Sequence, residues 1–219
     1  MSKKIIAILM CLTISASFIG CVNKDKAEDS KNQKTVVEIT DDDLKGPWAT
    51  DFTLIKFNDK FDNILKSVEE KTKEYGLQYT KEEIARDNNE KYITLENKGA
   101  EKNRLEGMYF GRTIYGDDSS SGKITMKLLL NFDGEAAKKD KNFDLGATSI
   151  AKYAEFFTEE HDRNYSELNE QILGALNSDK EEGIIRNQIN GLYEECTVTK
   201  TYIVYTLHTK KLDFKKPEQ

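Results

Sequence analysis

The chain has 219 residues, of which 37% are hydrophobic and 33% charged, and it includes 10 Phe, 10 Tyr and one Trp. This length suits one domain or two small ones, and the aromatic residues are numerous enough to form a core, so wholesale disorder is excluded. The formal net charge of -6 disfavours nucleic acid as a partner, because a phosphate backbone needs a basic surface.

The first twenty residues are typical of an export signal. Lys3 and Lys4 precede a mostly apolar run over residues 5–14, and small, less apolar residues follow up to Gly20. A basic start, an apolar run and an end of small residues are the three zones of a secretory signal peptide. The apolar part is shorter than the roughly 20 residues that span a bilayer. The sequence therefore predicts a cleaved signal at residues 1–20.

The end of this segment resembles a bacterial lipobox, the recognition sequence of lipoprotein signal peptidase. Ile19, Gly20 and Cys21 match the family pattern, while Phe18 stands where the family usually carries an aliphatic residue. The resemblance implies that Cys21 becomes the mature N-terminus and carries a diacylglyceryl group on its sulfur. It also implies a palmitate-type lipoprotein that faces away from the cytoplasm, since two acyl chains give stable anchoring. The alternative is an ordinary signal followed by an unmodified cysteine.

The membrane in which such a lipoprotein is anchored depends on the type of cell envelope. The frequent Lys, Asn and Ile residues are typical of a low-GC Gram-positive source, for which we expect the outer face of the cytoplasmic membrane. In a Gram-negative envelope, Val22 does not resemble an inner-membrane retention residue, and the outer membrane becomes the expected location.

The predicted mature chain lacks the means to form an internal disulfide. Cys11 leaves with the signal and Cys21 is lipidated, so only Cys196 remains. Loss of Lys3 and Lys4 leaves 31 basic and 39 acidic residues, a net charge of -8, which an anionic membrane surface repels. Residues 22–34 are polar and predict a linker, so we expect one globular domain over residues 35–219.

The first half of this domain predicts a helix followed by strands. The apolar spacing favours a helix over about 58–75, capped by Asn58 and ended by Gly76. The next predicted elements are an ambiguous strand or short helix, a turn, a strand, and a hairpin with a polar loop: residues 77–84, 87–89, 91–96, and 108–115 with 123–132. Apolar residues alternate along the second hairpin arm, which predicts a sheet with one buried and one solvated face.

The second half predicts helices followed by strands. Apolar residues indicate helices at 150–157 and 165–176, and Ser178 with Glu181 suggests a third helix at about 179–189. Residues 192–212 form either one long bent strand or two strands that meet near Lys200-Thr201. The expected fold is therefore α+β, with an antiparallel sheet of about 5–7 strands covered on one face by three to four helices. A loose duplication of residues 57–132 and 150–212 stays open, without a matching side-chain pattern.

Residue types that carry catalysis are sparse. The two histidines, His161 and His208, are too few for a His-rich metal site, and the sequence lacks a serine nucleophile elbow or a phosphate loop. If the chain turns near residue 200, Cys196 faces Tyr205 and lies about 10 Å from His208 along the strand. A cysteine–histidine dyad is therefore not expected, and we expect neither an enzyme nor a cofactor.

Two weak candidate sites remain. Asp140, Asn142 and Asp144 are spaced as in the calcium loop of the EF-hand, which they resemble, but Gly146 comes one place late and Ala151 replaces the bidentate Glu. The alternative is a polar loop before a helix.

Tyr109 and Tyr115 share the outer face of the first hairpin arm. Either they form a binding surface, because Tyr offers a large amphipathic area at low entropic cost, or a helix covers both rings.

The anchor and the absence of a recognisable catalytic motif together favour a non-enzymatic role. We expect the domain to bind a partner protein, a peptide or an envelope component at the cell surface. One alternative is a carrier of a lipid or another apolar ligand, which requires an apolar cavity of hundreds of Å³. The other is a carboxylate-based hydrolase, which requires converging acids with a raised pKa.

Overall fold

The computed structural model describes residues 38–85 and 89–216. The predicted signal, the lipidation site Cys21, the linker and most of the turn at 87–89 lie outside these ranges, so what was predicted for them stays a prediction. From Ile39 onward the described chain belongs to one unit.

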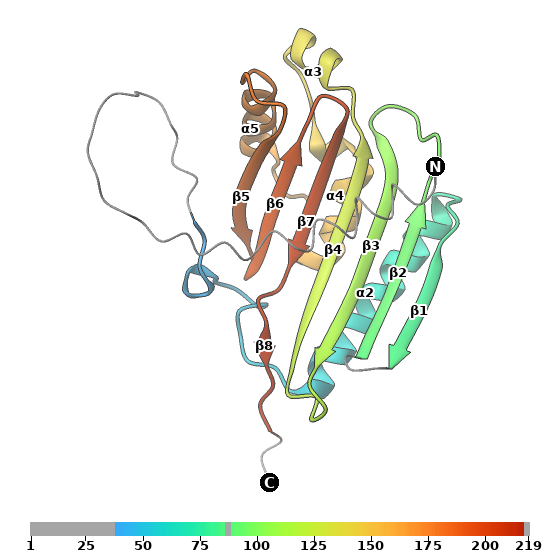
Figure 1. Ribbon diagram of the computed structural model, residues 1–219, viewed down its shortest axis with the longest axis vertical. Helices are drawn as coiled ribbons and strands as arrows, with labels where there is room; N and C mark the ends of the chain where they lie inside the picture. The colour runs from blue at the N-terminus through green and yellow to red at the C-terminus, as the bar shows by residue number, and fades with distance from the viewer. Residues whose placement is uncertain (1–37, 86–88, 217–219) are drawn as a thin grey trace, which may run out of the picture. The chain divides into compact units, whose positions relative to one another are not determined.

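An antiparallel sheet organises this unit, and its helices lie on one face of it (Figure 1). The strand order is β1-β2-β3-β4-β7-β6-β5, and the short β8 pairs with β4. The strands are β1 (Thr80–Ala85), β2 (Asn89–Glu96), β3 (Arg104–Tyr115), β4 (Ser121–Asn131), β5 (Gly183–Ile189), β6 (Leu192–Val198), β7 (Tyr202–His208) and β8 (Leu212–Asp213). The helices are α2 (Leu54–Glu74), α3 (Gly134–Asp140), α4 (Ser149–Thr158) and α5 (Ser166–Leu176), with 3-10 turns η1 (Asp41–Asp43) and η2 (Leu145–Ala147).

This arrangement confirms the predicted α+β fold. The four α-helices match the three to four expected, and the eight strands exceed the expected number by the two-residue β8. None of the helices in the described ranges is both long and apolar enough to span a membrane.

Helix α2 begins earlier than predicted. Its cap is Thr53, whose side chain accepts a hydrogen bond from the Lys56 backbone N at 3.3 Å, while Asn58 lies within the helix. The end is as expected: Gly76 follows the helix with a φ of +67°, a conformation that glycine adopts without strain. The predicted apolar face is buried, with Phe57, Phe61, Ile64, Leu65 and Val68 pointing to the sheet.

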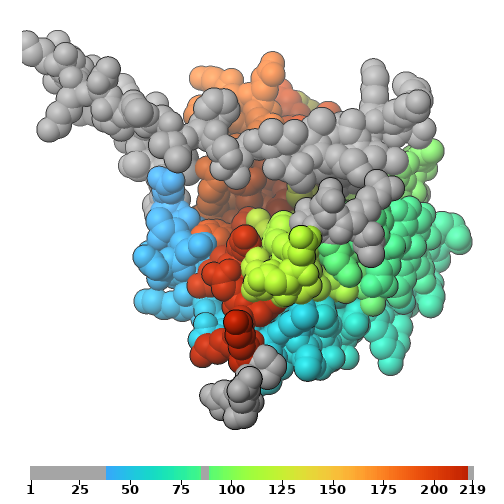
Figure 2. Space-filling view, turned by 60° about the horizontal axis from the view of Figure 1, so that its bottom comes forward, coloured from blue at the N-terminus to red at the C-terminus, as the bar shows by residue number. Residues whose placement is uncertain are grey.

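The hairpin of β3 and β4 forms the centre of the core. The inward residues of β4 alternate as predicted, and the exposed fraction is 0% at Ile124, Met126, Leu128 and Leu130. The rings of Phe61 from α2 and Phe157 from α4 both pack on Phe110 of β3, with centroids 5.2 and 5.7 Å away. The β3–β4 turn lies between α2 and the C-terminal segment (Figure 2). Packing next to this turn is tight, because a Cβ on Gly122 would meet the rings of Phe57 and Phe214.

The predicted third helix at 179–189 is wrong, because residues 183–189 form strand β5. The turn Asn190-Gly191 that follows has φ angles of +52° and +84°, which is the geometry of a tight two-residue hairpin. Ile189 consequently pairs with Leu192, and the strand pattern overrides the capping pattern of Ser178. Ser178 instead donates to the Ala175 carbonyl, where α5 ends. The short helix α3 was not predicted.

Two ambiguous segments are resolved. Residues 80–85 form strand β1 rather than a helix, and the last β region is two strands that meet at Lys200-Thr201. The Thr199 hydroxyl accepts hydrogen bonds from the Thr201 and Tyr202 backbone N–H groups and so closes that turn. In each half of the unit, helical residues are followed by an antiparallel meander: α2 precedes β1–β4, and α3–α5 precede β5–β7. The two meanders pair with each other through β4 and β7. A duplication stays a prediction.

Candidate functional site

The sheet face opposite the helices, called here the open face, carries the two predicted binding tyrosines. Tyr109 and Tyr115 alternate with the inward Phe110 and Ile114, as predicted. The helices in the described ranges pack on the inner face, so none of them covers the two rings (Figure 1). The Tyr109 ring stacks on Tyr92 at 5.6 Å, and the Lys211 Nζ lies 5.2 Å from the centre of the Tyr115 ring.

The Tyr92–Tyr109 stack depends on a glycine. Gly111 pairs with Tyr92 across β2 and β3. A Cβ at Gly111 would lie 2.6 Å from the Tyr109 Oη and 2.7 Å from the Tyr92 Cβ. No side chain other than hydrogen therefore fits between the two rings without displacing one of them.

Cationic side chains lie beside these tyrosines at the centre of the open face. Lys127 pairs with Tyr109 and Lys123 with Thr113 in the β3–β4 register. Burial lowers the pKa of both lysines. A hydrogen bond from the Tyr92 hydroxyl to Glu82 raises the pKa of Tyr92 to about 12, so its hydroxyl remains protonated at physiological pH. The centre of the open face thus combines stacked aromatic rings with lysines, of which Lys127 is buried.

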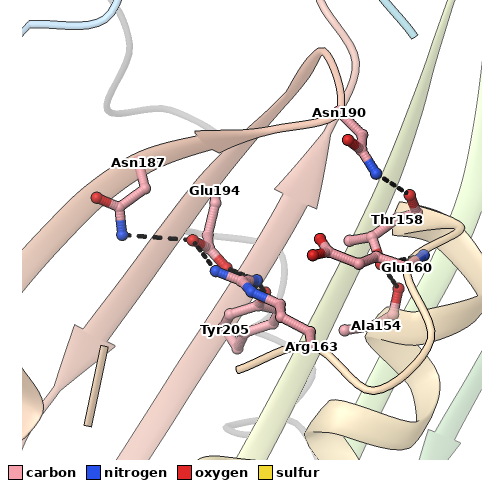
Figure 3. A network of polar contacts seen from close by, with 8 residues as sticks. All are labelled: Ala154, Thr158, Glu160, Arg163, Asn187, Asn190, Glu194 and Tyr205. Carbon is pink, nitrogen blue, oxygen red and sulfur yellow. Dashed lines mark hydrogen bonds and ion pairs between the residues drawn. The ribbon is translucent and has the colours of Figure 1, made fainter. Parts of the chain in front are cut away.

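On the inner face, a buried ion pair joins the loop after α4 to the sheet (Figure 3). Arg163 donates to both carboxylate oxygens of Glu194, at 2.5 and 2.9 Å, and Nη1 also donates to the Tyr205 hydroxyl at 3.1 Å. Tyr205 and Asn187 each donate to the same carboxylate. Burial opposes the charge of Arg163, but the hydrogen bonds to Glu194 hold its pKa above the ordinary value. Glu194 is thus fully satisfied inside the core.

Arg163 also lines an open pocket of about 520 Å³ between α4, α5 and their connecting loop. Most of the lining is polar or charged: Asp144, Lys152, Glu155, Glu160, Asp162, Arg163, Asn164, Ser166 and Asn169, with Gly146, Ala151 and Tyr165. Several of its carboxylates already have partners in the structure. Glu155 bonds to the His161 Nδ1 at 2.6 Å. The pocket can accept a small polar ligand, and among the described residues the side chains of Glu160 and Asp162 in its lining have no hydrogen bond or ion pair.

The three residues of the calcium-like spacing have separate local contacts. Asp140 ends α3, whereas Asp144 caps η2 by accepting from the Gly146 N at 2.8 Å and from the Asn169 Nδ2 at 3.2 Å. Asn142 donates its backbone N–H to the Ala137 carbonyl. Within the described ranges, no three or more His, Cys, Asp or Glu residues are grouped so that they could hold a metal ion.

Cys196 and His208 lie as the predicted strand register places them. Cys196 pairs with Tyr205 and His208 with Tyr193 across β6 and β7. The offset is odd, so the thiol points into the core and the imidazole lies on the open face. Burial raises the pKa of the Cys196 thiol, which keeps it protonated and unreactive.

Comparison with protein family models, curated proteins and solved structures found no match to this chain. The function is therefore inferred from the residues and their geometry alone.

The Arg163–Glu194 network was not predicted. One signal for it exists in the sequence: Glu194 occupies an inward position of a strand whose other inward residues are apolar, Leu192, Cys196 and Val198. A buried carboxylate of this kind requires a cationic partner. That partner is a loop residue from another part of the chain, which the strand pattern does not identify.

Proposed function

We propose that this protein is a lipoprotein of the cell membrane, held through a lipid on Cys21, whose domain binds a partner protein, peptide or envelope component outside the cytoplasm. The lipobox-like residues 18–21 support the anchor. The observation that carries the binding role is the open face, where Tyr92, Tyr109 and Tyr115 lie on a sheet whose described helices all pack on the other side.

A tyrosine-bearing open face favours binding because its rings offer contact area without large entropic cost. Tyr has only two side-chain torsions, and its ring contributes both apolar surface and a hydroxyl. The stack of Tyr92 on Tyr109 restricts both rings further before any partner arrives. A rigid aromatic surface loses less conformational freedom on binding than a flexible one.

The two alternatives receive less support. A carrier of an apolar ligand needs an apolar cavity, whereas the pocket beside α4 and α5 is open and mostly polar. A carboxylate hydrolase needs free acids that converge, whereas two of the four acids that line this pocket are engaged: Asp144 caps η2 and Glu155 is bonded to His161. These two engagements favour a structural use of Asp144 and Glu155.

The anchor is tested by replacing Cys21 with Ser in cells fed a labelled fatty acid. We expect loss of the label, accumulation of the unprocessed precursor and loss of the wild-type membrane-bound product. Unchanged acyl labelling and mature size in the Cys21→Ser variant would contradict the lipid anchor.

The binding role is tested by crosslinking on intact cells followed by identification of the captured molecule. The variants Tyr109→Ser and Tyr115→Ser should reduce the crosslinked product several-fold. Tyr75→Ser is the matched control, because Tyr75 is a 40% exposed tyrosine at the end of α2, away from the open face. Equal capture by all three variants would contradict the open face as the binding surface.

A further inference from the structure

Strand β5 leaves an unpaired edge at one end of the sheet. It is the last strand in the sheet order and pairs only with β6 among the described strands (Figure 1). In a hairpin with a two-residue turn, the pair that flanks the turn is hydrogen-bonded, and bonded and non-bonded pairs then alternate. Because Ile189 and Leu192 flank the turn, the main-chain groups of Ile184, Arg186 and Gln188 point away from β6.

No other part of the described chain uses these groups. No hydrogen bond outside the strand ladders reaches the main chain of Ile184, Arg186 or Gln188 in the described ranges. Ile184 is 42% exposed on this edge and is one of three large hydrophobic side chains in the described ranges with that degree of exposure. Free main-chain groups beside an exposed isoleucine form a template for another strand.

The opposite edge of the sheet, strand β1, is protected in the way that natural proteins often protect an edge. Strand β1 carries Lys81, Glu82 and Glu83 among its six residues. Charged side chains along an edge oppose pairing with another chain, because pairing would desolvate them. Strand β5 carries one charged residue, Arg186, so the two edges are unequally protected.

We propose that two copies of this chain pair antiparallel through β5, around a twofold axis at Ile184. In this register each Ile184 lies beside the Ile184 of the other copy, and each Arg186 lies opposite Glu182 of the other copy. A second copy fits because the edge is then complementary to itself, with apolar contact at the axis and opposite charges on either side. A register centred on Arg186 would instead place the two Arg186 guanidinium groups side by side.

The position of Glu182 agrees with this register. Glu182 is the residue before β5, and if the strand alternation is extended by one residue its side chain shares the open face with Ile184 and Arg186. Burial and the charge of Glu182 both raise the pKa of Tyr202, another open-face residue, which places the carboxylate near that ring. Arg186 itself lies on this face, where it bonds to Glu195 at 2.8 Å.

The twofold axis is perpendicular to the sheet, so both open faces point to the same side. Asp41, near the start of the described chain, accepts a hydrogen bond from the open-face Tyr193 at 2.5 Å. The beginnings of both domains therefore lie on one side of the pair, which suits two lipid anchors in one membrane. This orientation argument rests on the proposed function. Anchoring also raises the effective concentration, which a small strand–strand interface requires.

The test is thiol crosslinking of the full chain in membranes. The bismaleimide is chosen so that it is too short to join two cysteines about 13 Å apart. Ile184→Cys should give a covalent dimer. Arg186→Cys and Gln188→Cys should not, because their separations in this register are about 13 and 27 Å. Ile55→Cys is the matched control, since Ile55 is 69% exposed but lies on α2. Cys196 is buried and does not react, and the parent chain gives the background of the remaining cysteines.

Charge reversal provides a second, independent measurement. Arg186→Glu and Glu182→Arg, each added to the Ile184→Cys chain, should lower the dimer yield several-fold, and the two together should restore it. Restoration requires that the two residues face each other across the interface. Each variant's thermal melt shows whether a loss of dimer reflects loss of the fold.

Three results would overturn the proposal. A dimer through Arg186→Cys but not Ile184→Cys would exclude this register, and absence of a crosslink at all three strand positions would exclude the pairing. A product of Ile184→Cys with the mass of another protein would exclude a second copy as the occupant. The anchor is assessed separately by fractionation, so its failure and the failure of the dimer are distinguishable.

Discussion

Arg163 and Glu194 form a two-pronged ion pair, with contacts of 2.5 and 2.9 Å, between the loop after α4 and the inner face of β6. The Glu194 side chain is 1% exposed and that of Arg163 15%. The start of this loop is held as well, because Asn190 from the β5–β6 turn donates to the carbonyl of Thr158, the last residue of α4, at 2.8 Å. The loop that lines the pocket is therefore fixed to the sheet at two points.

Removing one partner of this pair should be costly. Arg163→Met leaves the buried Glu194 carboxylate without its cation, and the free energy of unfolding should fall by about 3–5 kcal/mol in denaturant titrations. The exposed pair of Lys215 and Asp51 is the control, since both side chains are more than half exposed. Lys215→Gln should change the stability by at most about 1 kcal/mol. Equal, small losses in both variants would contradict the structural role of the buried pair.

The stacked tyrosines of the open face should depend on Gly111. Gly111→Ala places a methyl group against the Tyr92 Cβ and the Tyr109 ring, and we expect the free energy of unfolding to fall by about 1–3 kcal/mol. Near-ultraviolet circular dichroism should change with it, because the tyrosine rings move. Gly174→Ala is the matched control: a Cβ at Gly174 in α5 meets nothing within 4 Å, so this variant should gain about 0.5–1 kcal/mol.

His208 should make the fold sensitive to acid. Burial, the nearby Lys123 and Lys127 lower its folded pKa from 6.5 to about 4, while Asp41 and a hydrogen bond to the Thr209 carbonyl act in the opposite direction. Between pH 6.5 and about 4, the imidazole is therefore protonated in the unfolded chain but neutral in the folded chain. The free energy of unfolding consequently falls as the pH drops through this interval.

The measurement is the free energy of unfolding between pH 7 and pH 4. His208→Gln should reduce the slope over this interval because it removes the titrating group. Identical slopes for the wild-type and the His208→Gln proteins would show that His208 is not the group responsible.

The Asn190-Gly191 turn, which follows β5, should tolerate only glycine at position 191. Gly191 has a φ of +84°, and a Cβ there would collide with the backbone of Ala49. Gly191→Ala should therefore cost more than Gly99→Ala, where φ is +77° but nothing lies within 4 Å of the added atom. Strain alone accounts for about 1–2 kcal/mol, and the difference between the two variants measures the collision. Equal melting temperatures would contradict this account.

Local patterns in the sequence were sufficient for much of this fold. The alternation along β4 identified its buried face, and the alternation along β3 placed Tyr109 outward, because a strand has a period of two wherever it lies. The error at residues 179–189 arose because Ser178 and Glu181 mimic a helix start, whereas Asn190-Gly191 is the stronger signal for a hairpin. Neighbouring residues alone decided both outcomes.

The site was less accessible to the same reasoning. The outward position of Tyr115 followed from alternation, but its cationic neighbour Lys211 comes from a distant segment. Arg163 likewise meets Glu194 only because the loop after α4 folds over β6. Contacts of this kind are set by tertiary packing, which has no period in the sequence.

The seam between β4 and β7 has a consequence for how the chain reaches its folded state. Every other pairing of a full-length strand in the sheet order joins neighbours along the chain, whereas here residues as remote as Thr125 and His208 must meet. Bringing β4 and β7 together closes a long loop, and the entropy of that loop is lost before the contacts between the two strands stabilise the fold. We therefore expect the two meanders to gain structure early and their union to limit the refolding rate, with the amides of this seam last to gain protection from hydrogen exchange.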